Sequence, residues 1–263
     1  MPKIAIVGGS GIYNPEGFEL IGEEFPDTPY GKPSDPITVG RISGVEVAFL
    51  FRHGKSHQHP PSSVPYRANM YALRKLGCEC VISACAVGSL QERFRPGDLV
   101  IADQFIDFTK CREYTYFTDR TVHISMPDPC CPYLSRVFAE TAEGLGMPYH
   151  LGGTYVCIEG PRFSTRAESA MFRRFGDIVG MTMVPECQLA RELGMCYCSL
   201  ATVTDYDCWK GEDVTIEAVM RTMAECLDRV LRLLEAGLPA IGAKDCRCAE
   251  SAEGCGATAA GDV

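Results

Sequence analysis

The sequence predicts an α/β protein, with one domain built on a mixed β-sheet flanked by helices. Apolar runs rich in β-branched residues alternate along the chain with stretches of helical periodicity, as in successive βα units. The 263 residues, 46% of them hydrophobic, are enough for one large core, and no linker of biased composition divides them. We therefore predict one domain over residues 1–241 and a cysteine-containing tail over residues 242–263.

The elements follow from these patterns in chain order. Residues 4–7 form an apolar run that stops at a double glycine, which predicts a buried first strand. Residues 37–52 alternate apolar and polar around Ser43-Gly44, which is typical of a β-hairpin. Residues 66–76 have helical spacing and end before Gly77. Further strands are predicted at 80–87, 98–106, 153–158 and 195–203, and helices at 132–145, 165–175, 185–193 and 213–235.

The charge and hydropathy patterns exclude several classes of partner. With 25 Lys and Arg against 34 Asp and Glu, the formal charge is −9, and no basic cluster could grip nucleic acid or an anionic membrane. No apolar run approaches the roughly 20 residues of a membrane-spanning helix. Residues 1–7 are too short for the apolar region of a signal peptide. We expect a cytoplasmic protein that binds neither nucleic acid nor membrane.

A glycine-rich segment follows the first predicted strand. In Gly8-Gly9-Ser10-Gly11, glycines would let backbone N–H groups approach an oxyanion, and Ser10 would add a hydroxyl donor. The segment lacks the lysine of a P-loop, and Asn14 occupies a position where a dinucleotide fingerprint has Gly or Ala. An anion cradle and a simple tight turn both fit this pattern.

A second candidate anion site ends the predicted hairpin. Arg52 and His53 could donate to a phosphate at the end of a strand, where α/β sheets commonly hold ligands. With His57 and His59 the same loop could instead supply three metal ligands. Pro60 and Pro61 disfavour a helix that would hold the three histidines at the spacing of metal ligands. Phosphate binding or a solvated basic loop is therefore favoured, and we predict no metal site here.

Two carboxylates follow the predicted strand at 195–203. Asp205 and Asp207 are two residues apart, which directs both side chains to one side of an extended chain. A paired site of this kind can keep one carboxyl protonated as an acid while the other remains an ionised acceptor. The alternative is an acidic helix start satisfied by its own amides.

Taken together, these motifs resemble the trimeric purine nucleoside phosphorylases, including the branch that acts on 5′-methylthioadenosine. The matching segments occur in the order of that family and cover nearly the whole chain. They are Gly8–Gly11, Arg52–Gly54, Ala86–Leu90, Asp103–Asp107, Ile158–Ser164, Gly180–Glu186 and Thr204–Trp209. The resemblance implies a nucleoside phosphorylase-like fold and a homo-oligomer, either a trimer or a dimer of trimers.

The resemblance also implies a role for each matched residue. Ser10, Arg52, His53, the amide of Ala86 and Thr182 would bind inorganic phosphate, with Cys85 in a position where the family commonly has a hydroxyl. Met181 would contact the sugar, Phe163 and Ser164 would flank the base, and Asp205 and Asp207 would read its edge. His123 matches a residue that reaches the 5′ end of a neighbouring subunit's substrate. The thiol of Cys85 is a weak donor, so phosphate would depend more on the other groups.

The implied reaction is phosphorolysis of 5′-methylthioadenosine to adenine and 5-methylthioribose 1-phosphate, with phosphate as co-substrate and no cofactor. Asp207 as an ionised acceptor would favour a 6-amino purine, whereas the family's 6-oxopurine enzymes usually carry Asn in this region. Val214, Ile216, Val219 and Met220 would line an apolar pocket for the methylthio group; by periodicity alone they are equally a helix core. The alternatives are a 6-oxopurine nucleoside or methylthioinosine phosphorylase, and a non-catalytic module that senses nucleotides or binds metal.

The 15 cysteines need a separate account in a cytoplasmic protein. Cys78, Cys80, Cys157, Cys187, Cys196 and Cys198 lie in predicted strands or on apolar helix faces, which predicts small buried hydrophobic residues. Heat-stable members of the family that the chain resembles join a C-terminal Cys-x-Cys as a disulfide, which implies that role for Cys246 and Cys248. A structural metal needs four ligands, and the tail supplies three, the third being Cys255.

Overall fold

The computed structural model describes residues 3–8, 18–211, 213–243 and 245–251. Its strands are β1 (Ile4–Gly8), β2 (Glu19–Glu24), β3 (Ile37–Ile42), β4 (Val45–Phe51), β5 (Cys80–Ser89), β6 (Leu99–Ala102), β7 (Gln104–Phe108), β8 (Tyr149–Leu151), β9 (Thr154–Ile158), β10 (Ile178–Gly180) and β11 (Cys196–Asp205). Its helices are α1 (Tyr66–Lys75), α2 (Pro132–Gly144), α3 (Arg166–Phe172), α4 (Met183–Glu192) and α5 (Ile216–Ala240), with 3-10 turns η1 (Pro61–Ser63) and η2 (Cys248–Ser251).

One mixed sheet joins these strands, which confirms the predicted fold class. Its main path runs β2-β3-β4-β1-β5-β10-β9-β7, and β11 pairs with both β5 and β6. The long strand β5 is the branch point, because it lies parallel to β1 and β11 and turns its last residues to β10 in antiparallel pairing. As a result the carboxyl ends of β4, β5 and β11 come together with the chain that leaves β10.

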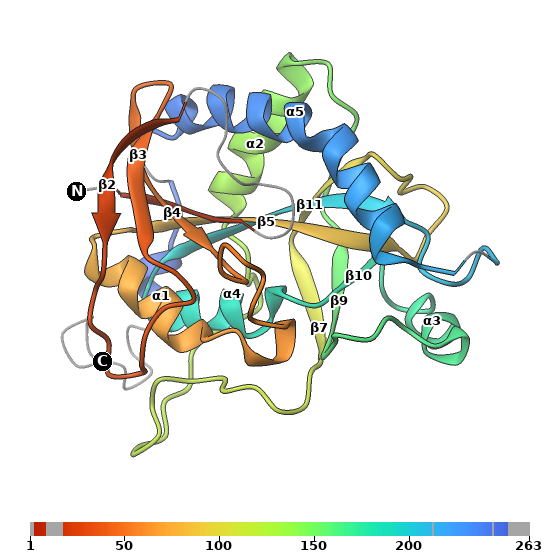
Figure 1. The fold of residues 1–263 in the computed structure, drawn as a ribbon, viewed down its shortest axis with the longest axis horizontal. Coiled ribbons are helices and arrows are strands. Elements are labelled where there is room, and N and C mark those ends of the chain that lie inside the picture. The colour runs from red at the N-terminus through yellow and green to blue at the C-terminus, as the bar shows by residue number, and fades with distance from the viewer. Residues whose placement is uncertain (1–2, 9–17, 212, 244, 252–263) are drawn as a thin grey trace.

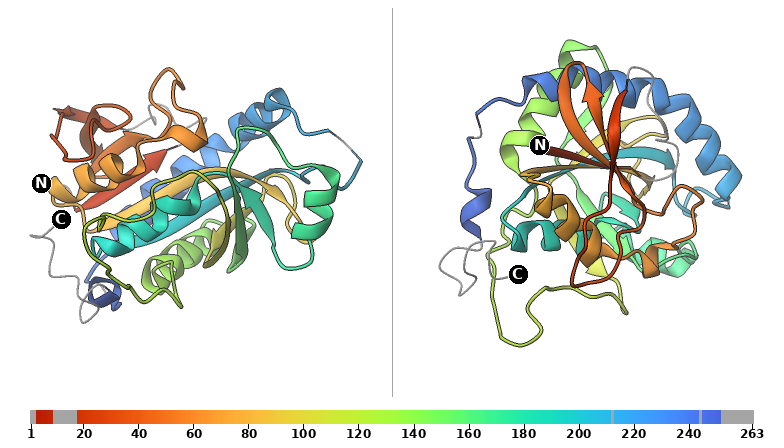
Figure 2. Two further views of the ribbon diagram at one scale, coloured as in Figure 1. Left: turned by 90° about the horizontal axis from the view of Figure 1, so that it is seen from below. Right: turned by 60° about the vertical axis from the view of Figure 1, so that its left-hand side comes forward.

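Helices cover both faces of the sheet (Figures 1 and 2). On one face α1 and α4 contact each other and bury Met70, Leu73 and Leu189 in a cluster with strand residues. On the other face α2 and α5 bury Phe138, Leu234 and their neighbours. α3 lies at one end of the sheet, away from both helix pairs (Figure 1). None of the helices described here is long and apolar enough to cross a membrane.

Most predicted elements are present, with shifted ends. α1 ends close to the predicted position, and Gly77 has a φ of +88°, as expected for a glycine that follows a helix. α5 begins at Thr215, whose hydroxyl accepts a hydrogen bond from the Ala218 amide, and it runs five residues beyond the predicted end at 235.

The predicted single strand at 98–106 is wrong. The chain breaks at Asp103, so that β6 pairs antiparallel with β11 whereas β7 pairs parallel with β9. The carboxylate of Asp103 accepts from the Gly153 amide at 2.9 Å, and this bond fixes the break between the two strands. The short strands β2, β8 and β10 were not predicted, because three to six residues are too few to show a period.

Candidate active site

A cavity of about 370 Å³ opens where β4, β5 and β11 end and where the chain leaves β10. Except for Ser10 and His123, every predicted site residue lines this cavity: Arg52, His53, Cys85, Ala86, Phe163, Ser164, Met181, Thr182, Asp205 and Asp207. These residues come from segments far apart in the sequence, so the topology of the sheet brings them together.

The two exceptions have different reasons. Ser10 and the rest of the glycine-rich segment after Gly8 lie outside the described residues. His123 is exposed on the segment between β7 and α2, which projects from the body as the yellow-green loop of Figure 1. Its side chain is not among those that line the cavity of its own subunit.

Arg52 is completely buried and its guanidinium is held by Glu186. Arg52 Nε donates to one Glu186 oxygen at 2.7 Å, and Nη2 donates to the other oxygen at 3.0 Å, a bidentate pair. Nη2 also donates to the Ser83 hydroxyl at 2.7 Å, and Nη1 donates to the Ala84 carbonyl at 3.2 Å. Within the described chain, the second N–H of Nη1 makes no hydrogen bond.

The charge on Arg52 is secured by this pairing. Burial by itself would lower the pKa of Arg52, but the Glu186 carboxylate outweighs burial and raises the pKa above its usual value. Ser83 and Tyr197 donate to the same Glu186 oxygen at 2.7 and 2.9 Å, so the carboxylate is itself well held. Glu186 belongs to a matched motif, but its role was not predicted; a buried acid in an apolar helix is the signal that could have indicated it.

His53 is a neutral imidazole beside this pair. Burial, together with the charge of Arg52, lowers the pKa of His53 to about 4. Its Nδ1 lies 2.8 Å from the His59 carbonyl, and since a carbonyl can only accept, Nδ1 carries the proton. Nε2 is then an acceptor, which can accept a hydrogen bond from the P–OH group of monohydrogen phosphate. In this tautomer His53 would therefore bind phosphate as an acceptor and not as the donor expected from the sequence.

The remaining polar groups of this end of the cavity are neutral. Burial raises the pKa of the Cys85 thiol to about 11, so it places no negative charge against an anion. The amide of Thr182 donates to the hydroxyl of Tyr155 at 3.3 Å, which fixes the segment that follows β10. At Gly180 a Cβ would lie 2.0 Å from the Tyr155 hydroxyl, so this close approach requires glycine.

The two predicted carboxyls lie further along β5, because Asp205 pairs with Gly88 whereas the Arg52 guanidinium donates to the Ala84 carbonyl. The Asp205 carboxylate accepts from the Thr204 hydroxyl and from the Asp207 amide, both at 2.7 Å. Burial raises the pKa of both Asp205 and Asp207, and a raised pKa favours the protonated form that can donate to a base. Asp207 has a φ of +50°, a conformation that Asp tolerates better than most residues, and this places its amide on Asp205.

The flanking side chains are set by α3 and its capping box. Thr165 and Glu168 exchange side-chain and backbone hydrogen bonds at the helix start, directly after Phe163 and Ser164. Phe163 lines the cavity and is half-exposed. The Ser164 hydroxyl is buried near Asp207, and it offsets part of the rise that burial causes in the pKa of Asp207. The hydroxyl of Ser169, also near Asp207, was not predicted.

The predicted apolar pocket is present in part. Val214, Ile216 and Val219 line the cavity, and they come from the start of α5 and the residues before it. Met220 is 40% exposed and is not among the lining residues, because its position on the helix turns it away. The prediction for Met220 is therefore not met in this subunit.

The histidine loop does not form a metal site in this structure. The His57 ring stacks on His53 at a centroid distance of 4.7 Å, and His57 and His59 both line the cavity. Over the described ranges, the only side chains gathered closely enough to hold a metal ion are a group of cysteines elsewhere in the molecule. The histidines therefore belong to the wall of the cavity.

Comparisons of the sequence and of the structure with known proteins find relatives of the same kind. The chain is 57% identical over 252 residues to the S-methyl-5′-thioadenosine phosphorylase of Pyrococcus furiosus, covering 95% of this chain and 97% of the relative. A methylthioadenosine phosphorylase from an antarctic soil metagenomic library superposes with a TM-score of 0.90 at 42% identity, covering 96% of this chain and 91% of that one.

A second solved structure of the same kind is also similar to this chain. Methylthioadenosine phosphorylase from Schistosoma mansoni, in complex with adenine, has a TM-score of 0.89 at 38% identity over 93% of both chains. The family model of the phosphorylase superfamily matches residues 3–238, which contain the sheet, helices α1 to α4, all but the last two residues of α5 and every cavity residue described above. On this match and these relatives, the chain belongs to the phosphorylase superfamily.

Proposed function

We propose that this enzyme cleaves 5′-methylthioadenosine with inorganic phosphate, giving adenine and 5-methylthioribose 1-phosphate. The carrying observation is the polarity of one cavity: it is lined by a buried guanidinium, by one buried and one partly buried carboxyl, and by an apolar wall. A phosphate, a sugar and a purine fit that lining. The relatives named above are phosphorylases of this same substrate, which supports the proposal.

We assign the phosphate end to Arg52, His53, Thr182, the amide of Ala86 and Ser10. Cleavage of an N-glycosidic bond gives the sugar oxocarbenium character, and a phosphate held beneath the sugar supplies both a countercharge and the nucleophile. The C1′–N9 bond breaks while a phosphate oxygen bonds to C1′. Cys85, a neutral thiol, contributes a weak donor or van der Waals contact only.

The base end is assigned to the carboxyls. The electron pair of the broken bond goes to the purine, which leaves as a neutral base once N7 receives a proton, and Asp205 is proposed to donate it. Asp207 would accept from the 6-amino group. Phe163 and Ser164 would flank the purine, and Met181 would contact the ribose. The raised pKa of Asp205 supports its proposed role as the acid.

The 5′ end and the assembly complete the proposal. The methylthio group would lie against Val214, Ile216 and Val219, and a neighbouring subunit would supply His123 from its projecting loop. We therefore propose a homo-oligomer, a trimer or a dimer of trimers. We further propose a cytoplasmic enzyme without a cofactor.

The test is adenine release with and without phosphate. Purified protein is incubated with 5′-methylthioadenosine, and product is measured by chromatography. We expect adenine and 5-methylthioribose 1-phosphate in equal amounts only when phosphate is present. Adenine release that is independent of phosphate, or no release at all, would overturn the proposal.

A substrate panel tests the specificity. We expect the highest kcat/KM with 5′-methylthioadenosine, a lower one with 5′-methylthioinosine and the lowest with inosine. Asp207→Asn should shift the ratio of the first two substrates toward methylthioinosine by about tenfold, since an amide can donate to O6. Asp213→Asn, at an exposed acid paired with Arg166, is the matched control and should leave the ratio unchanged. A wild-type preference for methylthioinosine would contradict the proposed substrate.

A further inference from the structure

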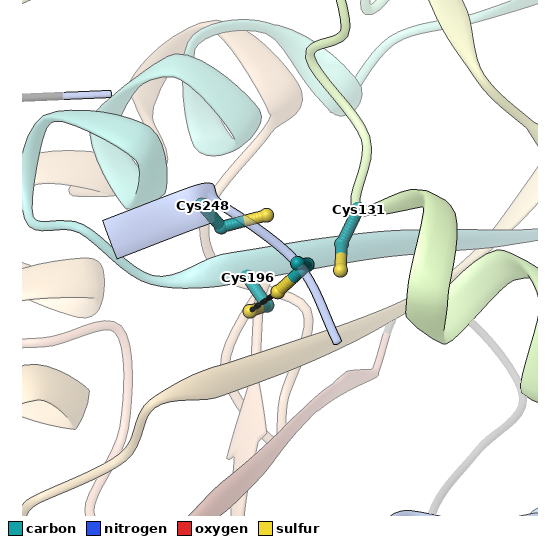
Figure 3. A group of neighbouring side chains, drawn as sticks. Cys131, Cys196 and Cys248 are labelled. Carbon is teal, nitrogen blue, oxygen red and sulfur yellow. Dashed lines mark hydrogen bonds between the residues drawn. The ribbon is translucent and has the colours of Figure 1, made fainter. Parts of the chain in front are cut away.

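Four cysteines from separate parts of the chain converge at the end of the sheet opposite the cavity. Cys131 precedes α2, Cys196 is the first residue of β11, and Cys246 and Cys248 belong to the chain after α5. Figure 3 shows the side chains of Cys131, Cys196 and Cys248 gathered at one place. The tail alone supplies too few ligands for a metal, and the fold adds two from the body of the protein.

The spacing of the four sulfur atoms matches tetrahedral coordination. All four lie within 4.8 Å of one another, and the Cys196 and Cys246 sulfurs are 3.5 Å apart. A tetrahedral zinc ion with Zn–S bonds of about 2.3 Å requires neighbouring sulfurs about 3.8 Å apart. Small rotations of the side chains would therefore be enough to close the site around an ion.

The surroundings are those of a structural site. Cys131, Cys196 and Cys248 are each less than 5% exposed, so three of the four ligands are shielded from water, and Cys246 is partly exposed. The backbone is fixed as well, because the Cys131 amide donates to the Tyr197 carbonyl at 2.7 Å. Buried Arg191 of α4 lies close enough to act electrostatically on Cys248. A positive charge at this position would offset part of the net −2 charge of an ion held by four thiolates.

We propose that Cys131, Cys196, Cys246 and Cys248 form a four-thiolate site for one Zn²⁺ ion per chain. Zinc favours four sulfur ligands in a closed tetrahedral set, with no position left for water. Each ligand binds as a thiolate, so loading of the fully protonated site releases four protons and involves no oxidation. The site is structural and not catalytic, because β11 carries Cys196 at one end and Asp205 at the other.

The consequence of binding is a link between three segments. The ion would join the start of α2, the start of β11 and the chain beyond α5, which otherwise is held by η2 and its contacts with α4. Binding of a ligand by the folded state alone stabilises that state. We therefore expect zinc to raise the melting temperature and to protect the segment after residue 241 from proteolysis, with little effect on kcat.

The experiment is metal analysis of the full-length protein. Protein produced with added zinc and purified anaerobically is measured by inductively coupled plasma mass spectrometry, and we expect one zinc per chain. Cobalt loaded in its place should give the visible absorption bands of tetrahedral Co²⁺ bound to thiolates. Cys131→Ser and Cys248→Ser should each lose the ion and lower the melting temperature while adenine release is kept.

Cys198→Ser is the matched control. Cys198 lies on β11 two residues after Cys196 and is also completely buried, but it is not one of the four ligands. This variant should keep one zinc and the cobalt bands even if its stability falls. The proposal is overturned if anaerobic wild-type protein holds no zinc, or if zinc binds equally to the Cys131→Ser and Cys198→Ser proteins. Mass spectrometry that finds Cys246 and Cys248 joined as a disulfide in that anaerobic protein would also overturn it.

Discussion

At the scale of single residues, the most constrained group in the cavity is the guanidinium of Arg52. Four of its acceptors come from Glu186, Ser83 and Ala84, so its position is determined by the protein before any ligand arrives. Such preorganisation lowers the cost of ordering a donor when phosphate binds. It also makes phosphate binding depend on Glu186, a residue that contacts with the ligand alone would not identify.

Glu186→Gln should weaken both the fold and the phosphate site. The substitution leaves a buried guanidinium without its counter-charge, a loss on the order of 3 kcal/mol in the free energy of unfolding. Because the Glu186 carboxylate no longer holds its guanidinium in place, Arg52 should bind phosphate less well. The KM for phosphate should therefore rise more than the KM for the nucleoside. Denaturant unfolding and initial rates at varied phosphate measure the two effects.

The control for this substitution is Glu192→Gln. Glu192 is also buried on α4, but it accepts from the Tyr116 amide and does not line the cavity. Its amide variant should leave KM for phosphate unchanged. If Glu186→Gln has the wild-type KM for phosphate, Arg52 is not the group that Glu186 positions for this ligand.

His53 should make stability depend on pH in a defined window. Its pKa falls from 6.5 in the unfolded chain to about 4 in the folded one, so between these values the unfolded state binds more protons. The stabilisation is fully present above pH 6.5 and is lost as the pH falls toward 4, by about 3 kcal/mol over the window. His53→Gln should flatten this part of the curve of unfolding free energy against pH.

Exposed His123 provides the comparison for this curve. His123→Gln removes an exposed histidine of the same chain, and it is measured over the same pH range as the comparison variant. An equal slope for the His53→Gln and wild-type proteins would mean that folding does not lower the pKa of His53.

At the scale of elements, α5 contributes both to the cavity wall and to the hydrophobic core. Its first turn adds Ile216 and Val219 to the cavity wall, whereas Val230 and Leu234 further along bury against α2 and the sheet. Both parts show the same helical periodicity, because one apolar face of the helix borders the cavity at its start and the core further along. This explains why periodicity alone could not separate a pocket from a core at the sequence level.

Val219→Thr should change substrate choice. The two side chains have nearly the same volume, but the hydroxyl adds a polar group to the apolar wall, which favours a 5′-hydroxyl over a methylthio group. We expect the ratio of kcat/KM for 5′-methylthioadenosine to that for adenosine to fall about tenfold. Val230→Thr, similarly buried on the same helix, should lower stability and leave the ratio unchanged. An unchanged ratio in Val219→Thr would place the methylthio group elsewhere.

At the scale of the whole molecule, the site is proposed to be complete only in an assembly. Chains with Asp207→Ala and chains with His123→Ala should each be impaired, the first in its own cavity and the second in its neighbour's. Unfolding and refolding the two together should restore wild-type sites in about one quarter of positions, by random mixing in a ring. Activity of the mixture and its mass by sedimentation are the measurements.

A mixture of Asp205→Ala and Asp207→Ala chains is the control for this experiment. Both residues line the cavity of their own chain, so every site in the mixture stays defective. Recovery in this control, or sedimentation of the active wild-type enzyme as a monomer, would contradict the shared site.

Much of this molecule could be predicted from its sequence, for physical reasons that also define what could not. Asp205 and Asp207 were predictable as site residues because they follow an apolar strand, but Asp207 lies in a turn with a φ of +50° and not in the extended chain that the same-side spacing assumed. The break at Asp103 was not, since it depends on a bond to Gly153, fifty residues away. Likewise Cys196 and Cys246 are 50 residues apart, and only the folded sheet brings their sulfurs together.

The pairing of Arg52 with Glu186 has a consequence for how the enzyme responds to ionic strength. The pair carries no net charge, and being buried it is little affected by dissolved salt. The long-range field of the chain comes instead from its formal charge of −9, which repels an incoming phosphate dianion. Added inert salt screens this repulsion and leaves the buried donors unchanged, so moderate salt should assist phosphate capture, the opposite of its effect on a site built from exposed lysines and arginines.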